Sequence, residues 1–161
     1  MKRYQPAPSM GWAWLIAMGL FLLALPVPAL LDGTGPFLLM LPFTWPFGIA
    51  FLVMAWWFPT LHYELGPAEL VLCYGPYRYS VPLREIQTVA RRNLALSLWS
   101  SVRFPGFAMW TVPYGDVGSV FMCATRSLTD ILYIVTPGRK YGITPANEDE
   151  FLADLTSHLK G

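Results

Sequence analysis

Two long apolar runs occupy the first third of the chain, and neither contains Asp, Glu, Lys, Arg or His. They extend over residues 10–31 and 37–58. A helix of about 22 residues is about 30 Å long, which matches the hydrocarbon thickness of a bilayer. The pattern therefore predicts two transmembrane helices that form a hairpin, with a short extracytoplasmic loop over residues 32–36.

Prolines interrupt both runs, at Pro26, Pro28, Pro42 and Pro46. In water they would argue against helix interiors. In hydrocarbon the helix is the open structure that satisfies the backbone, so kinked helices are expected. A cleaved signal peptide is the alternative for the first run. The length of that run and the second run close behind it favour a retained helix.

The flanking residues predict the orientation of the hairpin. Lys2 and Arg3 precede the first run, whereas the loop over 32–36 has no basic residue. Positive charge stays in the cytoplasm, so residues 1–9 are expected to be a short cytoplasmic tail. Tryptophans at the start of the first run and the end of the second would meet at one membrane interface. We therefore expect a multi-pass protein of the cytoplasmic (inner) membrane with a cytoplasmic domain over residues 63–161.

Beyond Tyr63 the pattern changes to short alternating segments. Tyr77, Tyr79 and Val81 alternate with Arg78 and Ser80, which is the pattern of a half-buried strand. Further strands are predicted over residues 69–74, 86–91, 119–125, 131–136 and 140–143.

One amphipathic helix is predicted over residues 147–159. Phe151, Leu152, Leu155 and Leu159 form an apolar stripe at helical spacing, and Asn147 stands three residues before Glu150 as in a capping box. About seven short strands followed by one helix predict a β-barrel or sandwich that is capped at one end.

Several short pieces of this region occur in an order and spacing typical of one family. They are Tyr63-Glu64-Leu65, Glu69-Leu70-Val71-Leu72, Gly75-Pro76, Val81-Pro82-Leu83-Arg84-Glu85-Ile86, Arg103-Phe104-Pro105-Gly106-Phe107, Ala124-Thr125-Arg126, Tyr141-Gly142-Ile143-Thr144-Pro145 and Glu150-Phe151-Leu152. From Tyr63 to about Leu159 the chain resembles the bacterial pleckstrin-homology (PH-like) domains, which often follow one or two membrane helices. The resemblance implies a strongly bent β-barrel with a C-terminal helix. It implies little about activity, because the fold hosts unrelated functions.

Only 13% of the 161 residues are charged, against about 25% in soluble domains, and the shortage falls in the two apolar runs, which favours lipid as their solvent.

Motifs argue against catalysis. The two histidines, His62 and His158, are far apart in sequence, and no cluster has zinc spacing. Nucleophile elbows and phosphate-binding loops are absent. We therefore expect no enzyme, no cofactor and no metal. Cys73 and Cys123 are expected to be reduced and buried.

An arginine-rich stretch is the first candidate for a binding surface. Five arginines and one acid lie between residues 78 and 103, whereas the C-terminal helix is acidic and the net charge is only +1. This balance disfavours nucleic acid. The arginines are either solvated on strand faces or face an anionic leaflet, where each would contribute up to about 1 kcal/mol. In the second interpretation the contacts are Arg84, Arg91, Arg92 and Arg103.

An aromatic segment over residues 98–114 is the second candidate. It is predicted to be a long loop that either plugs the barrel or exposes Trp99, Phe107 and Trp110 to the membrane or a partner.

Two functions are carried forward from these patterns. The first is a non-enzymatic, membrane-anchored PH-like module that binds a protein partner or anionic lipid headgroups at the cytoplasmic face. Its partners would be the lipid bilayer and a membrane protein or a second copy of the chain. The second is an accessory or assembly subunit of a membrane complex in which the hairpin makes the main contacts. Gly19, Ala24 and Gly48 would allow the helices to approach closely.

Overall fold

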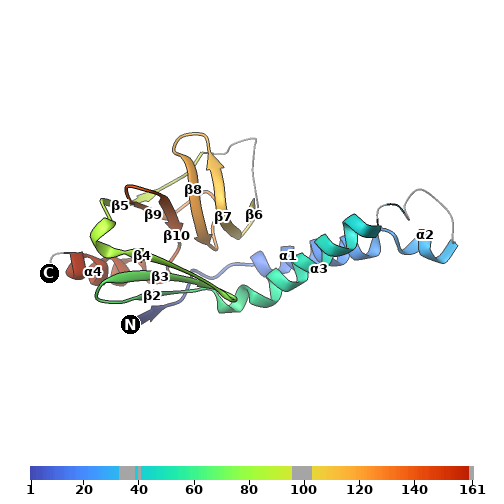
Figure 1. Cartoon of the computed structure of the whole chain (residues 1–161), viewed down its shortest axis with the longest axis horizontal. Coiled ribbons are helices and arrows are strands. Elements are labelled where there is room, and N and C mark those ends of the chain that lie inside the picture. The colour runs from blue at the N-terminus through green and yellow to red at the C-terminus, as the bar shows by residue number, and fades with distance from the viewer. Residues whose placement is uncertain (33–38, 40, 96–102, 160–161) are drawn as a thin grey trace. The chain divides into compact units, whose positions relative to one another are not determined.

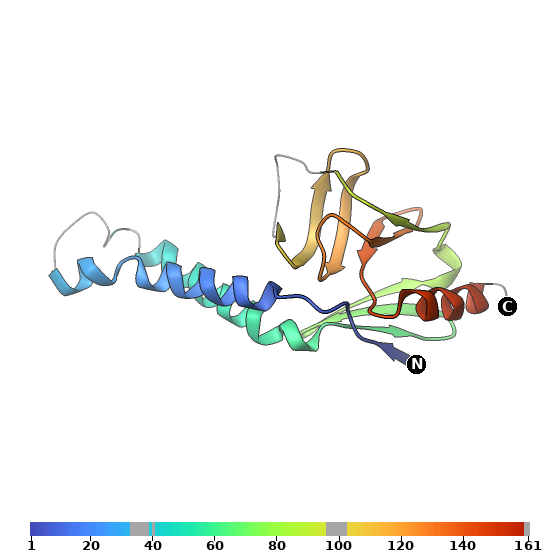
Figure 2. The same cartoon turned by 180° about the vertical axis from the view of Figure 1, so that it is seen from behind.

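The computed structural model describes residues 1–32, 39, 41–95 and 103–159. The chain forms two compact units, shown from opposite sides in Figure 1 and Figure 2. One unit is helical and spans Met10–Pro59. The other combines Met1–Ser9 with Thr60–Gly161, and we refer to it as the β domain.

The helical unit contains α1 (Gly11–Ala24), α2 (Val27–Asp32) and α3 (Leu41–Trp57), followed by one 3₁₀ turn, η2 (Phe58–Thr60). The first apolar run is therefore not one continuous helix. It is interrupted before Val27, because Pro26 has no N–H to donate and its ring crowds the preceding turn. Pro46, in contrast, lies inside α3.

Two glycines bring α1 and α3 into close antiparallel contact. A Cβ atom added to Gly19 would lie 3.0 Å from the carbonyl oxygen of Gly48, and one added to Gly48 would lie 3.0 Å from that of Gly19. Small residues allow this approach of two backbones. The antiparallel arrangement places Trp12 and Trp14 at the same end of the hairpin as the end of α3.

One helical stretch of the described residues, Leu41–Thr60, is long and apolar enough to cross a membrane. The 14-residue α1 is a shorter apolar helix. The two-span arrangement thus remains a prediction.

The β domain contains one four-stranded antiparallel sheet in the order β1-β2-β3-β4. Its strands are β1 (Lys2–Tyr4), β2 (His62–Leu65), β3 (Glu69–Tyr74) and β4 (Tyr77–Pro82). β1 was not predicted, because residues 1–9 were expected to be a tail. It pairs with β2 through Lys2↔Leu65 and Tyr4↔Tyr63. The whole helical unit is therefore inserted between two neighbouring strands of one sheet.

A six-stranded sheet has the order β5-β9-β10-β8-β7-β6. A 3₁₀ turn, η3 (Leu83–Glu85), leads from β4 into this sheet. The strands are β5 (Thr88–Arg92), β6 (Arg103–Phe104), β7 (Phe107–Tyr114), β8 (Gly118–Ala124), β9 (Ile131–Val135) and β10 (Lys140–Ile143). The pair β10 and β8 is parallel, and the other pairs are antiparallel. The prediction of a loop over residues 98–114 is wrong for its described part, because β7 pairs with β8 from Ala108 to Tyr114.

The two sheets form a mainly β sandwich with one C-terminal helix, α4 (Glu148–Leu159), which confirms that part of the predicted fold. Phe151 and Leu155 of α4 are buried. The sheets are linked inside the core by Tyr63. Its hydroxyl donates to the carbonyl oxygen of Cys123 at 2.7 Å and accepts from the backbone N–H of Thr144 at 3.1 Å.

Candidate functional site

Two of the predicted arginine contacts, Arg91 and Arg92, lie on opposite faces of β5. Arg91 donates from Nε to Glu148 Oε1 at 2.8 Å, and this hydrogen bond is the main reason that the Arg91 pKa is raised. Its neighbour Arg92 points to the opposite face of β5, where its guanidinium lies 5.8 Å from the ring centroid of Tyr133. Arg84 is exposed on η3 and lines an open cavity of about 670 Å³. The side chain of Arg103 lies outside the described residues.

The predicted aromatic contacts also differ in environment. Phe107 is fully buried and packs against Tyr74 with ring centroids 5.8 Å apart. It cannot touch lipid or a partner, because β7 places its side chain in the core. Trp110 is only half-buried and has a φ of 61°, a backbone conformation that is rare for a bulky residue. Trp99 lies outside the described residues.

Trp110 belongs to a row of five aromatic side chains that we name the aromatic ladder: Trp110, Tyr77, Tyr79, Phe121 and Tyr141. Successive ring centroids are 6.5, 6.4, 4.5 and 5.9 Å apart. Both sheets contribute, since β4 carries Tyr77 and Tyr79, and β7, β8 and β10 carry the other three. Tyr77, the second ring of the ladder, is 42% exposed, so the ladder is open to solvent at this ring.

A basic cavity adjoins the aromatic ladder. The Arg139 guanidinium lies 5.4 Å from the ring centroid of Phe121. The cavity holds about 320 Å³ and is lined by Thr111, Ser119, Phe121, Thr136, Pro137, Gly138, Arg139 and Lys140. A guanidinium beside hydroxyl groups and an aromatic face can bind a carboxylate or phosphate. Arg139 was missed in the sequence because it follows Pro137-Gly138 and reads as part of a turn.

A second cluster joins a histidine, a carboxylate and a thiol on β2 and β3. His62 and Glu64 are two residues apart and share one face of β2, and Cys73 is paired directly with His62. One ligand atom of each side chain lies within 4.8 Å of the others. Burial, with a further contribution from the Glu64 charge, raises the pKa of the Cys73 thiol. Sequence spacing alone did not suggest this cluster, but a hairpin centred on Pro67-Ala68 would have predicted the pairing.

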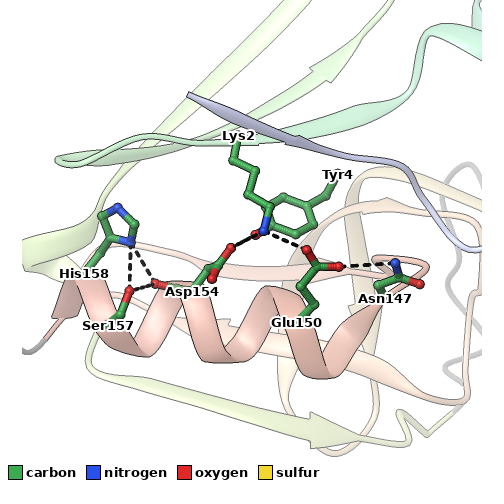
Figure 3. Close-up of polar contacts among 7 residues, drawn as sticks. All are labelled: Lys2, Tyr4, Asn147, Glu150, Asp154, Ser157 and His158. Carbon is green, nitrogen blue, oxygen red and sulfur yellow. Dashed lines mark hydrogen bonds and ion pairs between the residues drawn. The ribbon is translucent and has the colours of Figure 1, made fainter.

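A third polar group connects the N-terminal strand to the C-terminal helix (Figure 3). Lys2 Nζ lies 2.7 Å from Glu150 Oε1 and 2.6 Å from Asp154 Oδ2, and the Tyr4 hydroxyl also donates to Asp154. The Lys2 hydrogen bonds lower the pKa values of both carboxyls. The Tyr4 ring packs edge-on against Phe151 at 5.0 Å. These contacts hold β1 against α4.

Comparisons with curated proteins and with solved structures found no match. A family model described as the bacterial PH domain matches residues 61–159, which is more than half of the chain. The match begins at β2 and ends at α4, so it contains every strand of the β domain except β1. Domains of this family are generally binding modules without catalytic activity. The match confirms the resemblance seen in the sequence, and the chain belongs to the bacterial PH-domain family.

Proposed function

We propose that the protein is a non-enzymatic binding module, anchored in the cytoplasmic membrane by its helical unit, whose PH domain binds a protein partner or anionic lipid headgroups. The observation that carries the anchoring is the exposed apolar surface of the helical unit, and the pairing of β1 with β2 supports an even number of crossings. Family membership and the aromatic ladder with Arg139 support the binding role.

The β1–β2 pairing supports an even number of membrane crossings. Two strands that exchange backbone hydrogen bonds must lie on the same side of a bilayer. The chain between them can therefore cross twice or not at all. Leu41–Thr60 is long enough for one crossing, and the interrupted pair α1 and α2 is the return crossing in this proposal.

The surface of the helical unit favours two crossings over none. Large apolar side chains with more than a third of their surface exposed are concentrated in it: Met10, Trp12, Trp14, Leu20, Phe21, Val27, Leu30, Leu31, Leu39, Phe43, Trp45, Phe47, Ile49 and Trp56. Among the described residues of the β domain, only Met1, Tyr77 and Leu159 belong to this class. Soluble proteins rarely expose apolar patches of this kind, whereas a bilayer solvates them. Lys2 and Arg3 then favour the cytoplasm for both termini.

Anchoring is tested on the full-length chain with a different epitope tag at each end. After carbonate washing of membranes, both tags are expected in the pellet. Protease is expected to remove both tags from inverted vesicles and neither tag from sealed right-side-out vesicles. Recovery in the supernatant would exclude anchoring, and digestion of the two tags from opposite sides would exclude the even number of crossings.

Binding is tested by site-specific photo-crosslinking in native membranes from position Tyr77, the exposed ring of the aromatic ladder. The Arg139→Ala variant is expected to lower the crosslinking yield. Arg126→Ala is the matched control, because Arg126 is also exposed and contacts Asp130. Equal yields from wild type and both variants would remove Arg139 from the proposed surface.

The alternative role, an assembly subunit that works through its hairpin, loses one of its supports. Gly19 and Gly48 face each other inside the hairpin, so they serve the packing of α1 on α3. The photo-crosslinking experiment also addresses this role. If the crosslinks to a partner are retained in the Arg139→Ala variant, the assembly role is favoured.

A further inference from the structure

We propose that His62, Glu64 and Cys73 bind a divalent transition-metal ion of the Zn²⁺ class. The proposal concerns the β domain alone and is independent of membrane anchoring. It rests on the positions of three side chains that come from two paired strands.

The three ligand atoms are slightly farther apart than they would be around a bound zinc ion. They lie within 4.8 Å of one another. Zinc bonds are about 2.0 to 2.3 Å long, so ligand atoms around a tetrahedral ion are about 3.3 to 3.8 Å apart. Rotation about the side-chain bonds of Glu64 and His62 that moves their ligand atoms by about 1 Å closes this difference. Strand pairing fixes the backbone on both sides.

The hydrogen bond of His62 prepares its other ring nitrogen for a metal. Nδ1 lies 2.6 Å from the carbonyl oxygen of Thr60, which can only accept, so Nδ1 carries the proton. Nε2 lies 3.2 Å from Glu64 Oε1. When the His62 ring is neutral, His62 Nε2 and Glu64 Oε1 are both acceptors, so a positive species has to lie between them. That species is either a proton, giving an imidazolium–carboxylate pair, or a metal ion. A backbone acceptor on the second nitrogen is the usual support of a metal-bound histidine.

Two arginines lie beside Glu64 and their positive charges oppose a dication, so the ligands themselves have to neutralise the ion. Arg78 Nη1 lies 3.8 Å from Glu64 Oε2, which leaves Oε1 directed at His62. Arg3 stands opposite Glu64 on β1 and adds a second positive group. Metal binding forms the Cys73 Sγ–metal bond and releases the thiol proton to solvent. The resulting thiolate and the Glu64 carboxylate neutralise a 2+ ion, and His62 binds as the neutral imidazole.

Three protein ligands leave one position open in a tetrahedral site. Zinc sites with three ligands keep that position for water or an incoming group. Within the described residues no fourth His, Cys, Asp or Glu joins the cluster. The open position would therefore accept water or a donor atom from a bound molecule.

Cobalt(II) provides the direct test, because cobalt bound to a thiolate absorbs in the near ultraviolet and tetrahedral cobalt absorbs strongly in the visible. The full-length protein is purified in detergent with an affinity tag free of histidine, and titrated with Co²⁺ and then with Zn²⁺. We expect one cobalt per chain, a thiolate band, and loss of both bands when Zn²⁺ displaces cobalt. No thiolate band in the wild-type protein at excess cobalt would overturn the proposal and leave an ordinary His62–Glu64 ion pair.

Variants assign the ligands. Cys73→Ser is expected to lose the thiolate band, and His62→Gln and Glu64→Gln are each expected to lower Zn²⁺ affinity by about tenfold or more. Cys123→Ala and His158→Gln are matched controls that retain both bands. Far-ultraviolet circular dichroism verifies folding of each variant. Persistence of the band in folded Cys73→Ser, or its loss in folded Cys123→Ala, would refute the assigned ligands. If Cys73→Ser does not fold, unchanged Zn²⁺ affinity in both folded His62→Gln and folded Glu64→Gln refutes the site.

Discussion

Replacing Tyr63 with phenylalanine tests how the two sheets are held together. The ring remains, so no cavity forms, and only the hydroxyl is removed. In the wild-type protein that hydroxyl donates to the Cys123 carbonyl and accepts from the Thr144 amide. Burial raises the pKa of Tyr63, so the hydroxyl stays protonated at any ordinary working pH.

The magnitude follows from what each partner loses. The Thr144 N–H has one hydrogen to donate and is left buried without an acceptor, which costs about 1 to 3 kcal/mol. The Cys123 carbonyl has two lone pairs and loses one bond, at about 0.5 to 1.5 kcal/mol. The sum is about 1.5 to 4.5 kcal/mol. In a domain of about 100 residues each kcal/mol shifts Tm by about 4 °C, so a fall of about 6 to 18 °C is expected.

The assay is thermal unfolding of the full-length protein in detergent, with a chelator present, followed by near-ultraviolet circular dichroism at one scan rate. Tyr79→Phe is the matched control, because Tyr79 makes ring contacts to Tyr77 and Phe121 on the aromatic ladder. Its Tm should stay within about 2 °C of wild type, since surface changes of this kind alter stability by less than about 0.5 kcal/mol. If the Tm of Tyr63→Phe falls no further than that of Tyr79→Phe, the Tyr63 hydroxyl does not hold the two sheets together.

Three further predictions concern the ends and the packing of the chain. Glu150 and Asp154 have lowered pKa values, so their stabilisation of β1 is present above their ordinary pKa values and is lost as the pH falls through the lowered ones. The hydrogen-exchange protection factors of β1 should fall as the pH decreases over this range, and those of the Glu150→Gln/Asp154→Asn variant should show little pH dependence. Gly48→Val should separate α1 from α3 and lower the melting temperature of the helices, whereas Val at exposed Ala50 should not. At Trp110, glycine should be more stable than alanine by about 1 kcal/mol in urea unfolding, because φ is positive there; equal stability would contradict that strain.

The alternation of apolar and polar positions marks some strands clearly in the sequence. β4 shows this alternation in Tyr77, Tyr79 and Val81, and a predicted strand coincides with it. Strands β3 and β9 are buried along almost their whole length, and they were predicted as well. β7 is also largely buried, but it was missed because Pro113 lies inside it and Pro105-Gly106 precedes it. Prolines at such positions predict a loop, since proline cannot donate a hydrogen bond to a sheet ladder.

Long-range pairings account for the other differences. β1 has three residues and its partner strand follows about sixty residues later, so no local pattern marks it. Arg91 was expected to be available to a membrane, but α4 brings Glu148 to it across the fold. Asn147 was expected to cap backbone amides, and in the structure its Nδ2 donates to Glu150 Oε2 at 3.3 Å. Charge and spacing in a sequence predict residue types at a surface, whereas tertiary contacts decide which of them stay unpaired.

The insertion between β1 and β2 also constrains the order of folding. During synthesis Lys2–Tyr4 emerges first, yet its partner strand emerges only after the complete helical unit. Closing a flexible loop of that length carries an entropic cost that grows with the logarithm of its length. Formation of the antiparallel α1–α3 pair lowers this cost, because it draws the two ends of the insertion together before the strands meet. Loosening of the hairpin should therefore slow the attachment of the first strand more than the assembly of the six-stranded sheet.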